Sequence, residues 1–294
     1  MPRVKANGIE IEYETLGDPA DPPMLLIMGL GAQLITWDEG FCAALVERGF
    51  HVIRYDNRDA GLSTKMEEAG PADLVAAFSG RPKPAYTLDE LADDAAALLD
   101  ALRIDRAHIV GASMGGFIAQ LVAINHPERV LSLTSIMSGP GGEDAVPPTP
   151  EAGALLVQPV PPTREERIAM ALASSRILVG VQNPLDEARE RAHIERAYDR
   201  MYYRAGFGRQ LVAILAAKSR LPALKHVHVP ALVVHGLDDP LVPVENGRRV
   251  AAAIPGARLL ELEGMGHNIP ERYWPVVADA IALTARAAAS RLSA

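Results

Sequence analysis

A serine set between glycines, where an apolar run meets a helical pattern, constrains the fold of this chain more than any other feature. Residues 111–116 read Gly-Ala-Ser-Met-Gly-Gly and directly follow the apolar, strand-like residues 107–110. The glycines leave room for a backbone bend that larger side chains would obstruct. The sequence therefore predicts a strand, a sharp turn and a helix over residues 114–125, with the hydroxyl of Ser113 exposed at the turn.

Short apolar runs and helical patterns alternate through most of the chain. An Asn7-Gly8 pair within alternating residues indicates a hairpin near the N-terminus. Buried strands that alternate with helices favour a parallel sheet with helices on both faces, which is an α/β fold. Strands are expected at residues 24–28, 51–55, 107–111, 130–137, 229–235 and 257–262, helices at 37–48, 87–102, 114–125, 244–254 and from 271, and a long irregular stretch at 56–86.

The alternation stops between residues 139 and 225. Gly and Pro are frequent at the start of this stretch, and residues 163–221 carry helical patterns with no strand among them. We therefore expect a core domain formed by residues 1–138 and 226–294, and a helical cap, or lid, formed by residues 139–225.

Composition and charge exclude several classes of function. The formal net charge is −8, so we expect no nucleic-acid partner, because such a partner would need a clustered basic surface. No run of 18 apolar residues predicts a membrane span, and the first residues lack the apolar segment of a signal peptide, so a cytoplasmic location is expected. The single cysteine, Cys42, excludes an intrachain disulfide and lies among apolar neighbours, which indicates a buried thiol.

The sequence also lacks the motifs that hold metals or organic cofactors. It has no His-x-x-x-His pair and no clustered ligand set, so no metal site is expected. The glycines of residues 29–34 resemble the start of a dinucleotide fingerprint without its third glycine, and no Gly-Lys-Ser/Thr string occurs. We therefore expect chemistry that uses no cofactor. The sequence leaves the oligomeric state open.

Two later strands are followed by residues that can activate a serine. A nucleophilic serine needs a base and a group that orients the base. One strand is followed by Asp238 and Asp239, and the last strand by a glycine-rich loop that ends in His267. Because the carboxyl ends of parallel strands gather at one edge of a sheet, these side chains are candidate partners of Ser113. The histidines expected to be packed or capping residues instead are His108, His126 and His235.

Several strings of this sequence resemble those of one enzyme family. Beside the Ser113 turn they are residues 28–31 (MGLG), 54–63 (RYDNRDAGLS), 235–243 (HGLDDPLVP) and 264–267 (GMGH). With them the chain is similar over nearly its whole length to α/β-hydrolase-fold serine hydrolases, and most of all to the aclacinomycin methylesterase-like and related bacterial lipase/esterase branch. The resemblance implies a mostly parallel eight-stranded sheet flanked by helices, with an inserted helical cap.

The resemblance also implies a catalytic role for three residues. The nucleophile of the family falls on Ser113 and its base on His267. The acid follows a glycine after two intervening residues, and counting from Gly236 this spacing selects Asp239 over Asp238. We expect His267 to take the proton of Ser113 and Asp239 to orient the imidazole.

By the same resemblance, the backbone N–H groups of Leu30 and Met114 bind the oxyanion. The sequence departs from the family pattern at Met28. Many relatives have a histidine at this position, just before the glycine of the oxyanion loop, so the methionine removes a polar side chain that would support that loop. Methionines near the strand ends fit either an adaptable apolar pocket or ordinary core packing. These methionines are Met28, Met114, Met137 and Met265.

The expected function is that of a serine carboxylic-ester hydrolase that works through an acyl-enzyme intermediate. The expected substrates are moderately hydrophobic esters, such as a methyl ester or lactone of a polyketide-like compound, and the residues that bind them are left undetermined. The same triad also fits a cofactor-free haloperoxidase or perhydrolase, a C–C bond hydrolase, and a hydrolase-like ligand receptor with very slow turnover.

Overall fold

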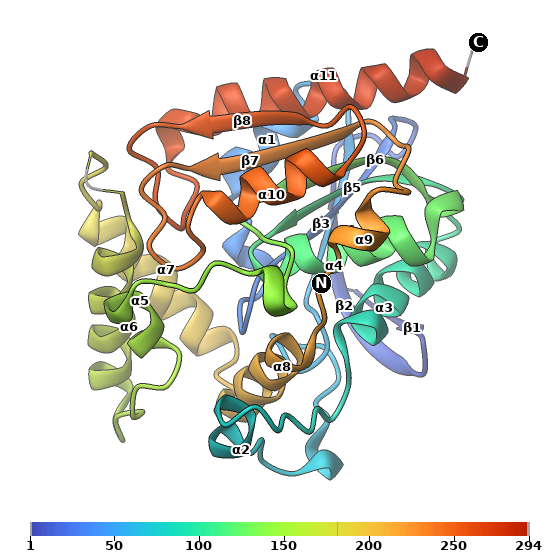
Figure 1. Cartoon of the computed structure of the whole chain (residues 1–294). Coiled ribbons are helices and arrows are strands. Elements are labelled where there is room, and N and C mark those ends of the chain that lie inside the picture. The colour runs from blue at the N-terminus through green and yellow to red at the C-terminus, as the bar shows by residue number, and fades with distance from the viewer. Residues whose placement is uncertain (1, 181, 293–294) are drawn as a thin grey trace.

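One sheet organises the molecule. The computed structural model describes residues 2–180 and 182–292, and within them eight strands are hydrogen-bonded in the order β1-β2-β4-β3-β5-β6-β7-β8 (Figure 1). The pairs β1–β2 and β2–β4 are antiparallel and the other pairs are parallel, which confirms the predicted mostly parallel α/β sheet. The strands are β1 (Arg3–Ala6), β2 (Ile9–Leu16), β3 (Pro23–Ile27), β4 (His51–Tyr55), β5 (Ala107–Ala112), β6 (Val130–Ile136), β7 (Ala231–Gly236) and β8 (Arg258–Leu262).

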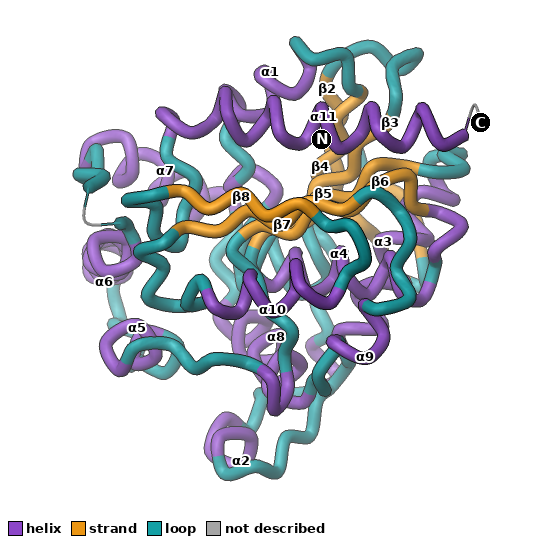
Figure 2. The backbone as a smooth tube through the Cα atoms, turned by 45° about the horizontal axis from the view of Figure 1, so that its top comes forward, coloured by secondary structure: helices purple, strands orange, loops and turns teal. Residues whose placement is uncertain are grey.

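Helices cover both faces of this sheet. Figure 2 shows α1 and α11 on one face and α3, α4 and α10 on the other. Each face has its own hydrophobic core, as a sheet buried on both sides requires. Within β3, Leu25 and Ile27 pack into one core and Met24 and Leu26 into the other. The helices are α1 (Glu39–Val46), α3 (Leu88–Ala101), α4 (Met114–Asn125), α10 (Glu245–Ala253) and α11 (Trp274–Leu292).

The ends of several elements differ from the prediction for local reasons. The first helix begins at Glu39 rather than residue 37, because the side chain of Asp38 accepts the N–H of Gly40 and caps it. The capping box predicted from Thr87 and Glu90 is present at the start of α3. The last helix follows a short 3-10 turn, η5 (Glu271–Tyr273).

The stretch 56–86 is not wholly irregular, so that prediction was wrong in part. It contains a 3-10 turn, η2 (Glu67–Ala69), and a short helix, α2 (Leu74–Phe78). The side chain of Asp73 caps α2 by accepting the N–H of Ala76 at 2.9 Å. A five-residue helix is shorter than the window in which helical periodicity can be recognised.

Between β6 and β7 the described residues contain helices and 3-10 turns and no strand. We call residues 139–225 the inserted segment; its division from the rest as a separate cap domain remains a prediction. Figure 1 shows α5, α6 and α7 beside the ends of β7 and β8, and α8 close to α2. The elements of the inserted segment are η4 (Gly142–Asp144), α5 (Pro150–Leu155), α6 (Arg164–Leu178), α7 (Glu187–Arg200), α8 (Arg204–Ala216) and α9 (Leu221–Leu224).

Two further predictions concern burial and membranes. Cys42 is fully buried and packs in the core under α1 and α11, as predicted. In the part of the chain that the structure describes, no helix has the length and apolarity needed to cross a membrane.

Candidate active site

The turn between β5 and α4 is sharp because three glycines permit close contacts with neighbouring atoms. A Cβ on Gly111 would lie 2.0 Å from the carbonyl oxygen of Gly115, and a Cβ on Gly115 would lie 2.0 Å from that of Ile27. A Cβ on Gly116 would lie 2.5 Å from the Cβ of Ser138. The bend places Ser113 at φ +57°, ψ −122°, which is strained for a residue other than glycine.

The backbone of Ser113 is fixed to β6 and to the segment after it. Its N–H donates to the carbonyl oxygen of Ile136 at 2.9 Å, and its carbonyl oxygen accepts the hydroxyl of Ser138 at 2.9 Å. The strained turn is therefore held in place by its neighbours, as a preorganised nucleophile requires.

The structure brings together three of the side chains that the sequence singled out. Nε2 of His267 lies 2.9 Å from Oγ of Ser113, and Nδ1 of His267 lies 2.7 Å from Oδ2 of Asp239. Asp238 takes no part in this chain of hydrogen bonds, and its Oδ2 has no hydrogen-bond partner among the described residues. Serine, histidine and aspartate thus lie in hydrogen-bond contact at the carboxyl ends of β5, β8 and β7.

The carboxyl group of Asp239 is held in its ionised form. Burial alone would raise its pKa, but the charge of His267, the nearby ring of His235, and hydrogen bonds from His267 and the N–H of Val242 lower the pKa to about 2. Its Oδ1 also accepts the N–H of Leu241 at 2.9 Å and that of Val242 at 2.8 Å. A fixed, charged carboxylate is suited to orient an imidazole and to stabilise it when it becomes protonated.

The histidines expected to be structural do have structural contacts. His108 is buried, with Nδ1 2.8 Å from the hydroxyl of Ser132. His126 follows α4 as its C-cap, with Nε2 2.7 Å from Oδ1 of Asp93. His235 is also fully buried and lies 3.6 Å from Asp239. The proximity of His235 to Asp239 was not predicted from the sequence, although their i, i+4 spacing across a tight turn indicates it.

The loop that carries His267 is bonded to the inserted segment. The N–H of His267 donates to the carbonyl oxygen of Leu178 at 2.7 Å, and the amide of Asn183 donates to the carbonyl oxygen of Gly264. A Cβ on Gly266 would lie 2.2 Å from the carbonyl oxygen of Leu178, so the two backbones are in direct contact. Sequence patterns gave no sign of this contact.

The loop after β3 lies against Ser113. A Cβ on Gly29 would be 3.0 Å from the Cβ and 3.4 Å from the Oγ of Ser113. Leu30 follows Gly29, and Met114 is the first residue of α4. No hydrogen bond between described residues is donated by the N–H of Leu30 or of Met114. Both groups are therefore free to bind an oxyanion beside the serine.

The backbone at Met28 is held by a polar side chain. The carbonyl oxygen of Met28 accepts the amide of Asn57 at 2.9 Å, which supports the start of this loop. All four methionines near the strand ends are at least 93% buried and pack in the hydrophobic cores, which favours the core-packing alternative. Met114 packs in the hydrophobic core on one face of the sheet. The core on the other face contains Met28, Met137 and Met265.

No arrangement suited to a metal ion is present in residues 2–180 and 182–292, where no group of three or more His, Cys, Asp or Glu side chains could hold one.

Comparison with known proteins agrees with this geometry. The family model described as alpha/beta hydrolase fold matches residues 22–271. The chain is 34% identical to rhodomycin D methylesterase DnrP of Streptomyces peucetius, over 96% of this chain and 97% of that protein. A meta-cleavage product hydrolase from Pseudomonas fluorescens IP01 has a TM-score of 0.78 with 21% identity, covering 98% of each chain. The enol-lactonase from Burkholderia xenovorans LB400 has a TM-score of 0.71 with 27% identity, covering 98% of this chain and 100% of that one.

Proposed function

The chain belongs to the α/β-hydrolase family, and from this premise we propose that it is a serine carboxylic-ester hydrolase in which Ser113 is the nucleophile, His267 the general base and Asp239 the orienting acid. The observation that carries the proposal is the continuous hydrogen-bonded path from Oγ of Ser113 through His267 to Asp239, with separations of 2.9 and 2.7 Å. Both distances are short enough for direct proton transfer along the first link and for orientation along the second.

The acylation step follows from these contacts. Nε2 of His267 takes the proton of Ser113 as Oγ forms a bond to the ester carbonyl carbon, and the carbonyl π electrons move onto oxygen. The N–H groups of Leu30 and Met114 donate hydrogen bonds to that oxyanion. When the tetrahedral intermediate collapses, the bond to the alkoxy group breaks, and the imidazolium returns the proton to the leaving alcohol.

Deacylation repeats the sequence with water in place of the serine. His267 takes a proton from water, the hydroxide adds to the acyl carbon, and the bond to Oγ of Ser113 breaks as the proton returns to the serine. Asp239 stays ionised throughout, because its pKa of about 2 lies far below neutral pH. Its negative charge stabilises the imidazolium that forms in each half-reaction.

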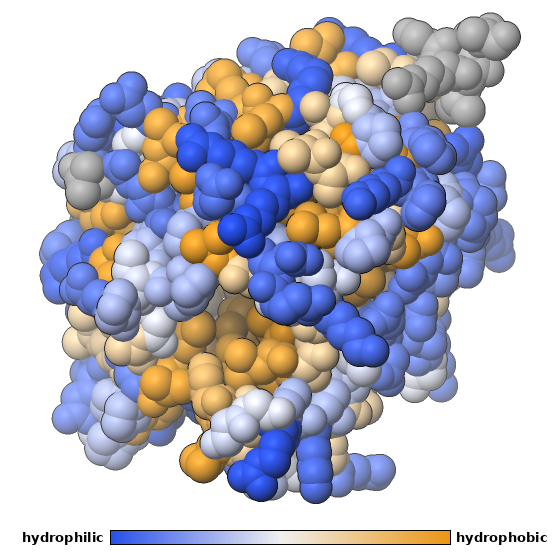
Figure 3. Space-filling model, viewed as in Figure 1, coloured by the Kyte–Doolittle hydropathy of each residue, from blue (hydrophilic) through white to orange (hydrophobic). Residues whose placement is uncertain are grey.

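The proposed substrates are moderately hydrophobic esters, with methyl esters of polyketide-like compounds first among them. The relative named a rhodomycin D methylesterase supports the methyl ester. Figure 3 shows an apolar, hollowed surface where α8 lies in Figure 1. Helix α8 carries Phe207, whose ring lies 2.7 Å from the place where a Cβ on Gly31 would stand, next to Leu30. An apolar surface beside the oxyanion loop favours an ester with a hydrophobic acyl part.

The cytoplasmic location and the lack of a nucleic-acid partner remain predictions from the sequence.

A panel of esters together with a fluorophosphonate probe tests this proposal. The panel contains methyl esters of aromatic polyketides, macrolactones and p-nitrophenyl esters of increasing acyl length. We expect prompt labelling that is lost in Ser113→Ala, and many turnovers with at least one hydrophobic ester. Stoichiometric labelling with negligible turnover on the whole panel would instead indicate a ligand receptor. Turnover that survives in Ser113→Ala would refute the triad.

A further inference from the structure

The side-chain amide of Gln210, on α8, joins two loops next to the proposed catalytic centre. Its Oε1 accepts the N–H of Gly31 at 2.7 Å, and its Nε2 donates to the carbonyl oxygen of Arg58 at 2.8 Å. The side chain is fully buried. Both ends of the amide are therefore bonded to backbone groups, and leaving either unpaired would carry the desolvation cost of a buried polar group.

The surroundings of Gln210 leave α8 little room to move relative to these loops. A Cβ on Gly206 would lie 2.0 Å from the carbonyl oxygen of Asp59, and the guanidinium of Arg209 bonds both carboxylate oxygens of Asp59 at 2.7 and 2.8 Å. On the other side, the ring of Phe207 packs directly on Gly31. Helix α8 is thus in direct contact with the loop that contains Gly31 and with the loop that contains Asp59.

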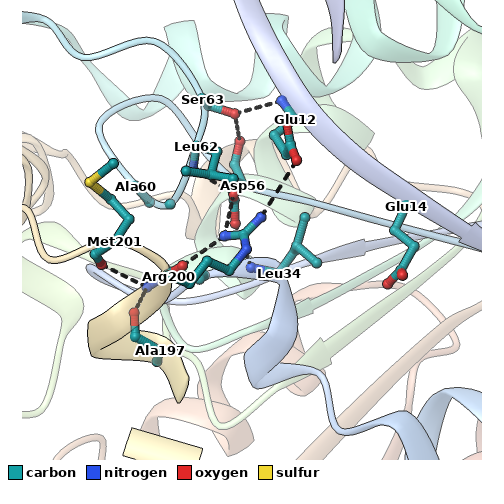
Figure 4. Close-up of polar contacts among 12 residues, drawn as sticks. Glu12, Glu14, Leu34, Asp56, Ala60, Leu62, Ser63, Ala197, Arg200 and Met201 are labelled. Carbon is teal, nitrogen blue, oxygen red and sulfur yellow. Dashed lines mark hydrogen bonds and ion pairs between the residues drawn. The ribbon is translucent and has the colours of Figure 1, made fainter. Parts of the chain in front are cut away.

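Helix α7 is hydrogen-bonded to the loop after β3, at the end of that loop beyond Gly31 (Figure 4). Its Arg200 donates to Oδ2 of Asp56 at 2.8 Å. Arg200 also donates to Oε1 of Gln33 at 2.6 Å. Nε2 of Gln33 donates in return to the carbonyl oxygens of Ala197 and Met201, at 2.6 and 2.8 Å. Oδ1 of Asp56 accepts the N–H of residue 34 at 2.6 Å. The loop is therefore bonded to the inserted segment at both of its ends.

Leu30 lies between two fixed points. Gly29 on one side is in contact with Ser113, and the N–H of Gly31 on the other side is bonded to Gln210. Because peptide units are planar, fixing the N–H of Gly31 also fixes the plane that includes the Cα of Leu30. The N–H of Leu30 shares a peptide plane with the carbonyl oxygen of Gly29, which accepts the N–H of Ala32 at 3.2 Å. The direction of the Leu30 N–H is then set by this bond together with the fixed Cα of Leu30.

We propose that Gln210 is a positioning residue that aims the backbone N–H of Leu30 at the oxyanion, so that the inserted segment completes the oxyanion site. This inference rests on the proposed function, because it takes Leu30 as an oxyanion donor. It assigns to α8 a part in the chemical step, in addition to any part in the shape of the substrate pocket.

The test compares an ordinary ester with the thionoester in which sulfur replaces the carbonyl oxygen. Sulfur is a weaker hydrogen-bond acceptor than oxygen, so the ratio of the two kcat values measures how much the oxyanion donors contribute. In Gln210→Met we expect kcat for the oxygen ester to fall with KM little changed, and the oxygen-to-sulfur ratio to fall about 10-fold or more, since losing one such donor costs about 10²–10³. Gln210→Glu keeps an oxygen acceptor for the N–H of Gly31 and should restore most of the ratio.

Two controls make the result specific. Gln158→Met makes the same change in the inserted segment at a side chain that bonds the hydroxyl of Ser174 and not the loop, and should leave the ratio unchanged. If Gln210→Met does not fold, Gln210→Asn, whose shorter amide cannot span both loops, gives the same measurement. A folded Gln210→Met or Gln210→Asn variant that keeps the wild-type ratio overturns the inference, even if both rates fall. Activity that survives in Ser113→Ala refutes the proposed function instead, so the two failures are distinguishable.

Discussion

The backbone N–H of His267 donates a hydrogen bond to the carbonyl oxygen of Leu178 at 2.7 Å. Leu178 is the last residue of α6, so the loop that holds the imidazole is attached to the inserted segment. The opposite side of the site has the same dependence, because Gln210 of α8 bonds the loop of Leu30. The sheet places the serine, but the inserted segment contacts the loops that would supply its base and one of its oxyanion donors.

Asp239 and Asp238 are expected to respond very differently to the same substitution. Asp239→Asn should lower kcat about 10⁴-fold, because an amide favours the wrong tautomer of the histidine it contacts. Asp238→Asn should change kcat little, because Asp238 has no hydrogen bond to His267 among the described residues. Steady-state kinetics on one p-nitrophenyl ester measures both, with thermal unfolding as a check on folding. A greater loss from Asp238→Asn would show that the acid is assigned to the wrong residue.

A methyl group at Gly115 should damage the turn that carries Ser113. The added Cβ would lie 2.0 Å from the carbonyl oxygen of Ile27, and backbone on both sides leaves little room for adjustment. We expect Gly115→Ala to lower the free energy of unfolding by about 1–3 kcal/mol, as overpacking does, and to reduce labelling by a fluorophosphonate probe.

Gly208→Ala is the matched control for that substitution. Gly208 lies within α8, and its added Cβ would meet only the Cβ of Ala72, at the ordinary contact distance of 3.4 Å. Alanine favours a helix over glycine by about 1 kcal/mol, so this variant should be as stable as the wild type or more so in urea unfolding. Equal effects from the two substitutions would contradict the steric explanation.

The features that could be predicted from the sequence are those with a local cause. The Ser113 turn was predictable because its glycines and its serine are neighbours in the chain. Asp239 and His267 could be proposed because each follows a strand, and parallel strands bring their carboxyl ends to one edge. The mostly parallel sheet followed from the alternation of apolar runs with helical patterns.

The contacts that position the site could not be predicted in this way. Gln210 and Gly31 are 179 residues apart, and Arg200 and Asp56 are 144 apart. A glutamine or an arginine within a helical pattern indicates only a polar position, and no periodicity relates it to a distant loop. Such a pairing depends on how the inserted segment packs on the core, which sequence patterns do not determine.

The only cysteine should be unreactive in the folded protein. Burial raises the pKa of the Cys42 thiol to about 12, so almost none of it is the reactive thiolate at pH 8, and the surrounding core excludes reagents. We expect no reaction with iodoacetamide in the native state and one equivalent of alkylation after unfolding in urea, both measured by intact-mass spectrometry. Cys42→Ala provides the control. Rapid native alkylation would mean that the core under α1 and α11 opens readily.

His108 should make the fold sensitive to acid in a defined range of pH. Burial lowers the pKa of His108 from 6.5 to about 4, so the unfolded chain takes up the proton first as the pH falls. The stability due to neutral His108 is therefore complete above pH 6.5, declines between pH 6.5 and 4, and is lost below about pH 4. The shift corresponds to about 3 kcal/mol at most, by the relation of 1.36 kcal/mol per pKa unit.

Replacing the ring by an apolar side chain in His108→Leu should flatten the plot of unfolding free energy against pH in this range, whereas His226→Leu at an exposed histidine should not. Urea unfolding at a series of pH values measures the three slopes, and equal slopes for wild type and His108→Leu would exclude His108 as the source of the acid sensitivity.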